Sequence, residues 1–395
     1  MSKAPNGYGL NELFQILRDG RPRTRAELAE LTGISRSTIG LRVDTLLASG
    51  LIMPVADAVS TGGRPSARVV FNPAARIVAA ADLGATHATV AITDLSGTVL
   101  SQSRSNLLIA SGPERVLDYL TRTIGTLIEG LDRDTSDLVT IGIGLPGPVE
   151  HTNGIPSKPP LMPGWDGFDV PQFVRKTYDV PVLVDNDVNI MALGERAMHW
   201  PAATHLLFIK VATGIGSGII SGGVLQRGAD GVAGDVGHIS VSRAQGVVCL
   251  CGNIGCLEAV AGGPAIATAL RNIGLDVSTG HEVVSLVEQG NLEAIRVVRQ
   301  AGRDIGEVLN MCVNIINPQV IVIGGSTAQA GEHLIAGIRE VVYARAMPLA
   351  TRHLTITASQ AGAEAAILGA SLMAIDYALL PENVDIIARR TDELS

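Results

Sequence analysis

The chain has 395 residues, more than one ordinary hydrophobic core accommodates, so we expect two or three domains. No run approaches the ~20 consecutive apolar residues of a membrane helix, and the first residues lack the apolar core of a signal peptide. With only four cysteines, the composition predicts a cytoplasmic protein and excludes a membrane-spanning one. Residues 1–75 carry nine Lys/Arg against six Asp/Glu, whereas the whole chain has a net charge of −8. A basic N-terminal head on an acidic body indicates a polyanionic partner for the head.

The head is expected to contain three helices, over residues 9–19, 24–32 and 35–48. Thr24 and Glu27 have the spacing of a capping box, Gly33 ends the second helix, and Ser35 caps the third. Two short helices joined by a Thr-Gly-Ile turn predict a helix-turn-helix. The side chains expected to meet double-stranded DNA lie in the N-terminal half of the third helix: Ser35, Arg36, Ser37, Thr38 and Arg42.

A wing is expected after the third helix. Two short apolar segments, 51–52 and 69–71, flank the polar, glycine-rich residues 60–66. Arg64, held extended before a proline, is placed to enter a minor groove. A winged helix used for protein contacts or dimerisation is the alternative, but the basic and hydroxyl side chains favour operator DNA.

From residue 76 onwards, three glycine loops each follow a strand and suit a nucleotide. Backbone N–H groups of such loops cradle phosphates, and a carboxylate beside them meets a hydrated Mg²⁺. The alternative is that the glycines serve packing only. The order of the loops matches the actin–hexokinase type of fold. The candidate residues for ATP and Mg²⁺ are Asp82, Gly84, Thr86, Thr213, Gly214, Gly216, Gly324 and Gly325.

Between the first two loops, an apolar strand over residues 182–184 leads into Asp185-Asn186-Asp187 at a strand-to-helix junction. A carboxylate here can accept the proton of a sugar hydroxyl during phosphoryl transfer, and Asn186 can hydrogen-bond a neighbouring hydroxyl. Asp187 is therefore a candidate catalytic base if the chain is a kinase. Plain helix capping is the alternative.

A metal site is expected near the middle of the chain, where His238 precedes Cys249, Cys251 and Cys256. Three thiolates and one imidazole form a closed tetrahedral set for Zn²⁺ with no position left for water, so the zinc is expected to be structural. A cysteine-rich buried turn without metal is the alternative. The fourth cysteine, Cys312, lies in an apolar stretch and is expected in the core.

The last segments complete the expected domain organisation. Residues 363–379 predict a helix that packs back on the body, and residues 381–395 predict a solvated charged tail. The expected domains are a winged head (1–75), a small lobe (76–200) and a large lobe (201–380).

Together the glycine loops, Asn-Asp, Gly-x-Gly-His, Cys-x-Cys-Gly-x-x-Gly-Cys-x-Glu and the late Gly-Gly-Ser resemble the ROK family (repressors, open reading frames and sugar kinases). With its head, the chain is similar to ROK repressors of the xylose-repressor type. The resemblance implies a multidomain α/β protein with a two-lobed actin/hexokinase-like body, a sugar effector in the cleft, and a homodimer or homotetramer. It also implies that His238 holds zinc with one ring nitrogen and faces a sugar hydroxyl with the other. The sugar contacts that it implies are Asn186, Asp187, Asp235, His238 and Glu258.

The sequence departs from the family's kinases at four positions. Ala85 and His87 replace Gly and Lys of the first phosphate loop, Asp235 replaces the Glu before Gly-His, and Leu161 stands where an Asn commonly contacts sugar. These changes favour a sugar-responsive regulator, most simply a repressor, of carbohydrate uptake or metabolism genes. An ATP-dependent sugar kinase, or a bifunctional kinase and regulator, is the alternative. The winged head argues against a pure kinase.

Overall fold

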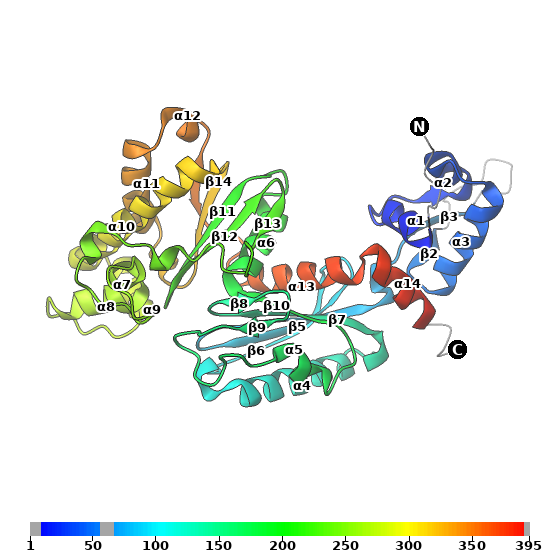
Figure 1. The fold of residues 1–395 in the computed structure, drawn as a ribbon, viewed down its shortest axis with the longest axis horizontal. Helices are drawn as coiled ribbons and strands as arrows, with labels where there is room; N and C mark the ends of the chain where they lie inside the picture. The colour runs from blue at the N-terminus through cyan, green and yellow to red at the C-terminus, as the bar shows by residue number, and fades with distance from the viewer. Residues whose placement is uncertain (1–8, 56–66, 391–395) are drawn as a thin grey trace.

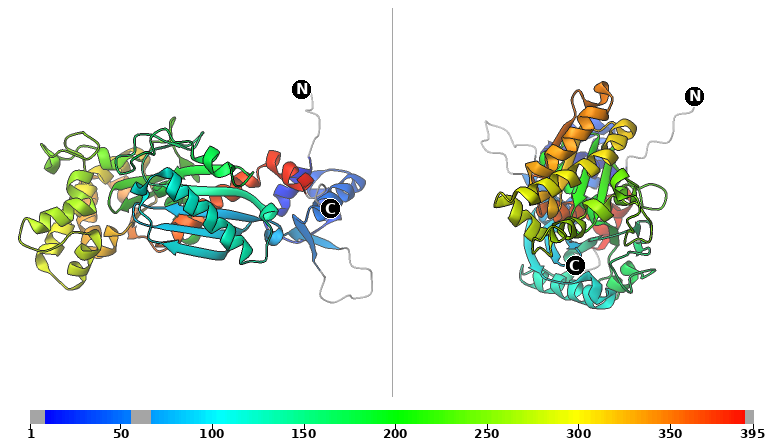
Figure 2. Two further views of the ribbon diagram at one scale, coloured as in Figure 1. Left: turned by 90° about the horizontal axis from the view of Figure 1, so that it is seen from below. Right: turned by 90° about the vertical axis from the view of Figure 1, so that its left-hand side faces the viewer.

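The computed structural model describes residues 9–55 and 67–390, and they form a head at one end of an elongated molecule followed by two α/β lobes (Figures 1 and 2). Among these residues, none of the helices combines the length and apolar character that crossing a membrane requires.

The head is a winged helix-turn-helix, as the sequence predicts. Thr24 and Glu27 make the expected reciprocal capping bonds, with Glu27 N donating to Thr24 Oγ1 at 3.2 Å and Thr24 N donating to Glu27 Oε2 at 2.6 Å. Gly33 ends the second helix at φ 71°, a left-handed conformation that glycine adopts without strain. The predicted wing tip, with Arg64, lies outside the described residues. The head comprises α1 (Leu10–Leu17), α2 (Arg25–Thr32), α3 (Arg36–Ala48), β1 (Arg23–Thr24), β2 (Ile52–Val55) and β3 (Arg68–Phe71).

Each lobe contains a five-stranded sheet, and the two sheets share one topology. In both, three consecutive strands form an antiparallel meander, and two later strands add in parallel beside the first of them. This repeated plan confirms the expected actin/hexokinase-like body. The small-lobe order is β10 (Val182–Asn186), β7 (Leu138–Leu145), β4 (Ile77–Leu83), β5 (Ala88–Asp94) and β6 (Val99–Ser105). The large-lobe order is β13 (Val224–Gln226), β12 (Ile215–Ser221), β11 (Leu206–Val211), β14 (Val320–Gly324) and β15 (Thr355–Ala358).

Helices cover both faces of each sheet (Figure 1). The outer face of the small sheet carries α4 (Pro113–Glu129) and α5 (Val170–Arg175), and a short hairpin of β8 (Val149–Glu150) and β9 (Ile155–Pro156) lies at its edge. The outer side of the large lobe carries α7 (Glu258–Ala261), α8 (Gly263–Arg271), α9 (Gly280–Glu288), α10 (Leu292–Ile316), α11 (Glu332–Arg345) and α12 (Pro348–Thr351). The inner faces are covered by α6 (Asp187–His199) and α13 (Glu364–Ala378).

The two inner helices, α6 and α13, pack backbone against backbone. A Cβ added at Gly194 would lie 1.9 Å from Ala365 O, and one at Gly369 would lie 1.7 Å from Ile190 O. Only glycine permits this approach. Because α6 packs on the large sheet and α13 on the small one, this contact joins the lobes.

The end of the chain differs from the expected solvated tail. It forms α14 (Pro381–Arg390), which returns to the head (Figure 1). Val384 and Ile387 are buried among head residues that include Leu13, and Gln15 Nε2 donates to Leu379 O at 2.6 Å. The two apolar residues stand three positions apart and therefore share one helix face. Because charged residues surround these two apolar residues, the sequence alone does not predict a packed helix here.

Candidate ligand cleft and metal centre

A cleft of about 920 Å³ opens between the lobes. The equivalent hairpin bends of the two sheets, 84–87 and 212–214, meet there with the ends of the parallel strands. Of the residues expected to bind sugar or nucleotide, Gly84 alone is not among those that line the cleft. Those that line it are Asp82, Thr86, Asn186, Asp187, Thr213, Gly214, Gly216, Asp235, His238, Glu258, Gly324 and Gly325.

At the centre of the cleft, Asp187 opens α6 and forms an ion pair with Lys210 of β11. Asp187 is not the helix cap, because Asn186 Oδ1 accepts from Val188 N at 2.9 Å. Burial disfavours the Lys210 ammonium, but the neighbouring carboxylates of Asp187 and Asp82 outweigh that effect and raise the pKa of Lys210. Sequence reasoning missed Lys210, and the only sequence signal for it is a lone cation inside an apolar strand.

The amide of Asn186 is already engaged within the protein. Besides the bond that caps α6, its Nδ2 donates to Gly147 O at 2.7 Å. These contacts fix the orientation of the side chain at the cleft wall. One further hydrogen on Nδ2 and one lone pair on Oδ1 remain for a ligand.

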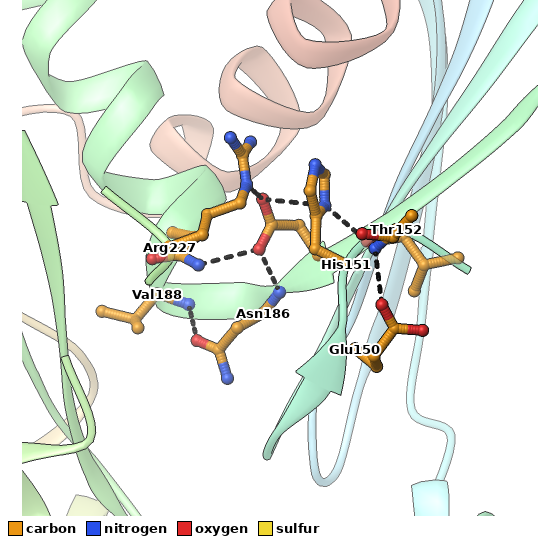
Figure 3. Close-up of polar contacts among 9 residues, drawn as sticks. Glu150, His151, Thr152, Asn186, Val188 and Arg227 are labelled. Carbon is orange, nitrogen blue, oxygen red and sulfur yellow. Dashed lines mark hydrogen bonds and ion pairs between the residues drawn. The ribbon is translucent and has the colours of Figure 1, made fainter. Parts of the chain in front are cut away.

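Beside Asn186, the buried carboxylate of Asp185 accepts hydrogen bonds from both lobes. Figure 3 shows Arg227, Asn186 and His151 converging at this point. The carboxylate accepts from Arg227 Nε at 2.7 Å, from Asn189 Nδ2 at 2.8 Å and from Asn186 N at 2.8 Å. His151 Nδ1, from the β8–β9 hairpin, lies 3.8 Å away. Because Arg227 follows β13 of the large lobe, Asp185 ties the lobes together at the edge of the cleft.

The side chain of His87 covers the backbone of the first predicted phosphate loop. His87 Nε2 lies 3.0 Å from Asp82 Oδ2, and a Cβ added at Gly84 would meet His87 Cε1 at 2.2 Å. The imidazole therefore lies against the loop backbone, where a phosphate would have to approach.

The other two glycine loops are also engaged. In the second loop, Ile215 N donates to Glu258 Oε2 at 2.9 Å. In the third, a Cβ at Gly325 would lie 2.5 Å from Val211 O, so this glycine serves close packing. The residues predicted for ATP surround the cleft, but the first two loops do not fit a phosphate as they stand.

The predicted metal ligands converge. The ligand atoms of His238, Cys249, Cys251 and Cys256 all lie within 4.8 Å of one another. The Sγ atoms of Cys251 and Cys256 are 3.8 Å apart, and Cys249 Sγ lies 3.7 Å from His238 Nδ1. Tetrahedral zinc with bonds of about 2.3 Å to sulfur has sulfur–sulfur edges of about 3.8 Å, so the donor set fits a metal.

The environment of this cluster favours the neutral thiol at two of its three cysteines. Burial raises the pKa of the Cys249 thiol and raises that of Cys256 to about 12, whereas the backbone N–H of Asn253 lowers that of Cys251. With Nδ1 of His238 facing Cys249, its Nε2 lies 3.9 Å from Asp235 Oδ1 at the cleft. Burial raises the pKa of Asp235, and His238 opposes that shift.

On the head, α3 presents its N-terminal residues to solvent. Ser35, Arg36 and Ser37 are exposed, and Ser35 Oγ accepts from Thr38 N at 3.3 Å. Arg42 is half-buried, and its Nη1 has no hydrogen-bond partner within the described part of the chain. The DNA-facing residues expected from the sequence are therefore grouped at one helix end, with Arg42 turned partly inward.

The fold and the site together define a two-lobed α/β protein that carries a winged helix-turn-helix. The sequence profile of the ROK family matches residues 78–377, and a profile described as winged helix-turn-helix DNA-binding matches residues 13–53. The chain belongs to the ROK family.

Transcriptional regulators match nearly the whole chain, head included. The xylose repressor of Bacillus spizizenii is 29% identical over 369 residues, which cover 93% of this chain and 94% of the repressor. The DNA-binding transcriptional dual regulator NagC of Escherichia coli K12 is 28% identical, with 90% and 89% covered. The crystal structure of a ROK family transcriptional regulator, a homolog of the E. coli MLC protein, has a TM-score of 0.80 at 26% identity and covers 96% of this chain and 98% of its own.

A kinase of the family matches the body alone. The ROK family glucokinase from Streptomyces griseus, in complex with glucose and AMPPNP, has a TM-score of 0.66 at 26% identity. The match covers 76% of this chain and 99% of the glucokinase. The regulators therefore share both the head and the body with this chain, whereas the glucokinase shares only the body.

Proposed function

We propose that the chain is a sugar-responsive transcriptional repressor of carbohydrate uptake or metabolism genes. The observation that carries this proposal is the joining of a winged helix-turn-helix to a ROK body, since the repressors match both parts. In the proposal, α3 reads the operator and the cleft binds a sugar. The bound metal is a structural zinc ion, held by His238 and the three clustered cysteines.

The proposed contacts keep the predicted residues. Operator DNA meets the N-terminal half of α3 and Arg64 of the predicted wing. A sugar meets the polar side chains of the cleft, and the metal fixes the ring of His238 so that Nε2 serves the sugar. The sugar contacts are Asn186, Asp187, Asp235, His238 and Glu258.

The proposed response is a population shift in a dimer or tetramer. A dimer reads two half-sites at a fixed separation, so a change in the spacing of its heads alters DNA affinity. A sugar that prefers the closed form of the cleft changes that spacing.

Fluorescence anisotropy on labelled DNA from the gene's own upstream region tests this proposal, at one fixed salt concentration and with a panel of sugars. We expect a sequence-specific complex whose affinity is shifted by one sugar. Arg36→Ala should weaken the specific complex by roughly tenfold or more and relax its sequence preference. The matched control, Arg296→Ala, removes an exposed arginine of the large lobe and should bind normally.

A folded protein that binds no fragment specifically would contradict the proposal. Sugar-dependent ADP release that disappears in Asp187→Ala would then favour the kinase.

A further inference from the structure

We infer that the cleft takes a neutral, unphosphorylated sugar without a nucleotide, and that Lys210 is a positioning residue that orients Asp187 for that sugar. The inference rests on the proposed function, in which a sugar binds in the cleft. It follows from how the chain's own side chains occupy the places where phosphates would lie.

The second glycine loop shows how a phosphate is excluded. Glu258 Oε2 accepts from Ile215 N and would lie 2.7 Å from a Cβ at Gly214. A backbone N–H that already donates to a carboxylate is not free for a phosphate oxygen. The negative charge of Glu258 would also repel the phosphate.

In the first loop, the obstacle is steric and electrostatic. The His87 ring lies against Gly84 and is hydrogen-bonded to Asp82. A hydrated Mg²⁺ would need that carboxylate, and a phosphate would need the space that the ring fills. Both loops are thus closed by side chains that a phosphate or its metal would have to displace.

The charges around Asp187 favour a neutral ligand. Lys210 contributes one positive charge, which the two carboxylates of Asp187 and Asp82 exceed. A phosphate monoester would add about −1.5 to −2 at this point. Arg104 and Lys158 also line the cleft, but both are exposed, and water screens their charge. A sugar hydroxyl adds no charge, and it can accept from Lys210 while donating to the remaining oxygen of Asp187.

Lys210 acts on the sugar through Asp187. The Asp187 side chain is only 7% exposed, and the Lys210 ammonium donates to its Oδ2. This bond fixes the orientation of the carboxylate and leaves its other oxygen to accept a hydrogen bond from a sugar hydroxyl.

Isothermal titration calorimetry on the full chain tests the ligand class. The probes are neutral aldopentoses, aldohexoses and N-acetylated amino sugars, their phosphates, and AMPPNP with Mg²⁺. We expect a neutral sugar to bind, its phosphate to bind roughly tenfold more weakly or not at all, and AMPPNP with Mg²⁺ neither to bind nor to change the affinity for the sugar. A phosphate that binds more tightly than its parent sugar, binding of AMPPNP, or no binding by any neutral sugar would overturn the inference.

Variants of Lys210 test its role. Lys210→Met should lower the affinity for the neutral sugar roughly tenfold or more, and Lys210→Arg should recover most of it, because a cation beside Asp187 is restored. A folded Lys210→Met with unchanged sugar affinity would refute the role. If that variant does not fold, Lys210→Met combined with Asp187→Asn removes the unpaired charge, and it should fold and still bind the sugar weakly.

DNA binding on the same samples separates this inference from the proposed function. A specific DNA complex that responds only to phosphorylated sugars overturns the ligand class and leaves the repressor intact. Binding of a neutral sugar by a protein that has no specific DNA affinity would support the ligand class and overturn the proposed repressor function.

Discussion

At the scale of single residues, the Asp185–Arg227 ion pair joins the two lobes, and removing it measures how much this contact contributes to stability. Asp185 is 2% exposed, so Arg227→Met would leave a buried carboxylate without its cation (Figure 3). We expect the free energy of unfolding to fall by about 3 kcal/mol, measured by urea titration. Arg296→Met removes an exposed pair with Glu293 and should cost less than about 0.5 kcal/mol. Equal losses in the two variants would show that Asp185 is held by its other donors.

The residues that sequence reasoning found differ in kind from those that it missed. The cysteine cluster is visible in the sequence because Cys249, Cys251 and Cys256 lie within eight residues of one another. Lys210 is 23 positions from Asp187, and Arg227 is 42 from Asp185. Sheet register and lobe packing bring these pairs together, so the spacing of residues along the sequence does not predict them.

At the scale of the element, backbone hydrogen bonds such as Val241 N to Gly255 O and Cys249 N to Asn253 O hold the loop from His238 to Cys256, and a metal on its four predicted ligands would cross-link it further. Removing the metal with a chelator should lower the melting temperature, since metal binding stabilises only the folded loop. The ligands must lose protons to bind a cation, and the raised pKa of Cys249 and Cys256 makes that loss harder as pH falls. Acidification should therefore release the metal.

Elemental analysis checks this prediction. We expect one zinc per chain in the wild type and nearly none in Cys256→Ser. Cys312→Ser, which changes the buried cysteine of α10 outside the cluster, should keep its zinc. Equal zinc in all three proteins would assign the metal to another site.

Helix boundaries were predictable where capping residues mark them, and less so where tertiary contacts decide. Thr24, Gly33 and Ser35 place the second and third head helices within a residue of those observed, whereas the first, expected to reach residue 19, ends at Leu17. In contrast, α14 forms because Val384 and Ile387 find the apolar face of the head. That stabilisation comes from packing rather than from local propensity, so charge composition alone predicted a tail.

At the scale of the whole molecule, one route of contacts runs from the cleft to the head. Asp187 opens α6, α6 packs on α13 through glycine contacts, and α13 leads into α14 on the head. Such close backbone packing moves as a unit, because a tightly packed contact cannot deform continuously. We therefore expect the proposed change in lobe closure to reach the head through these helices.

Coupling between the sugar cleft and the DNA-binding head gives a quantitative prediction for the complex of protein, sugar and DNA. If a sugar changes the affinity for operator DNA by some factor, the operator must change the affinity for that sugar by the same factor. A tenfold effect corresponds to about 1.4 kcal/mol of preference for one state. Calorimetric titration of the sugar into free protein and into the protein–DNA complex should give dissociation constants that differ by the factor seen in DNA binding. Equal constants, beside a sugar-dependent change in anisotropy, would mean that the change does not come from sugar bound in the cleft.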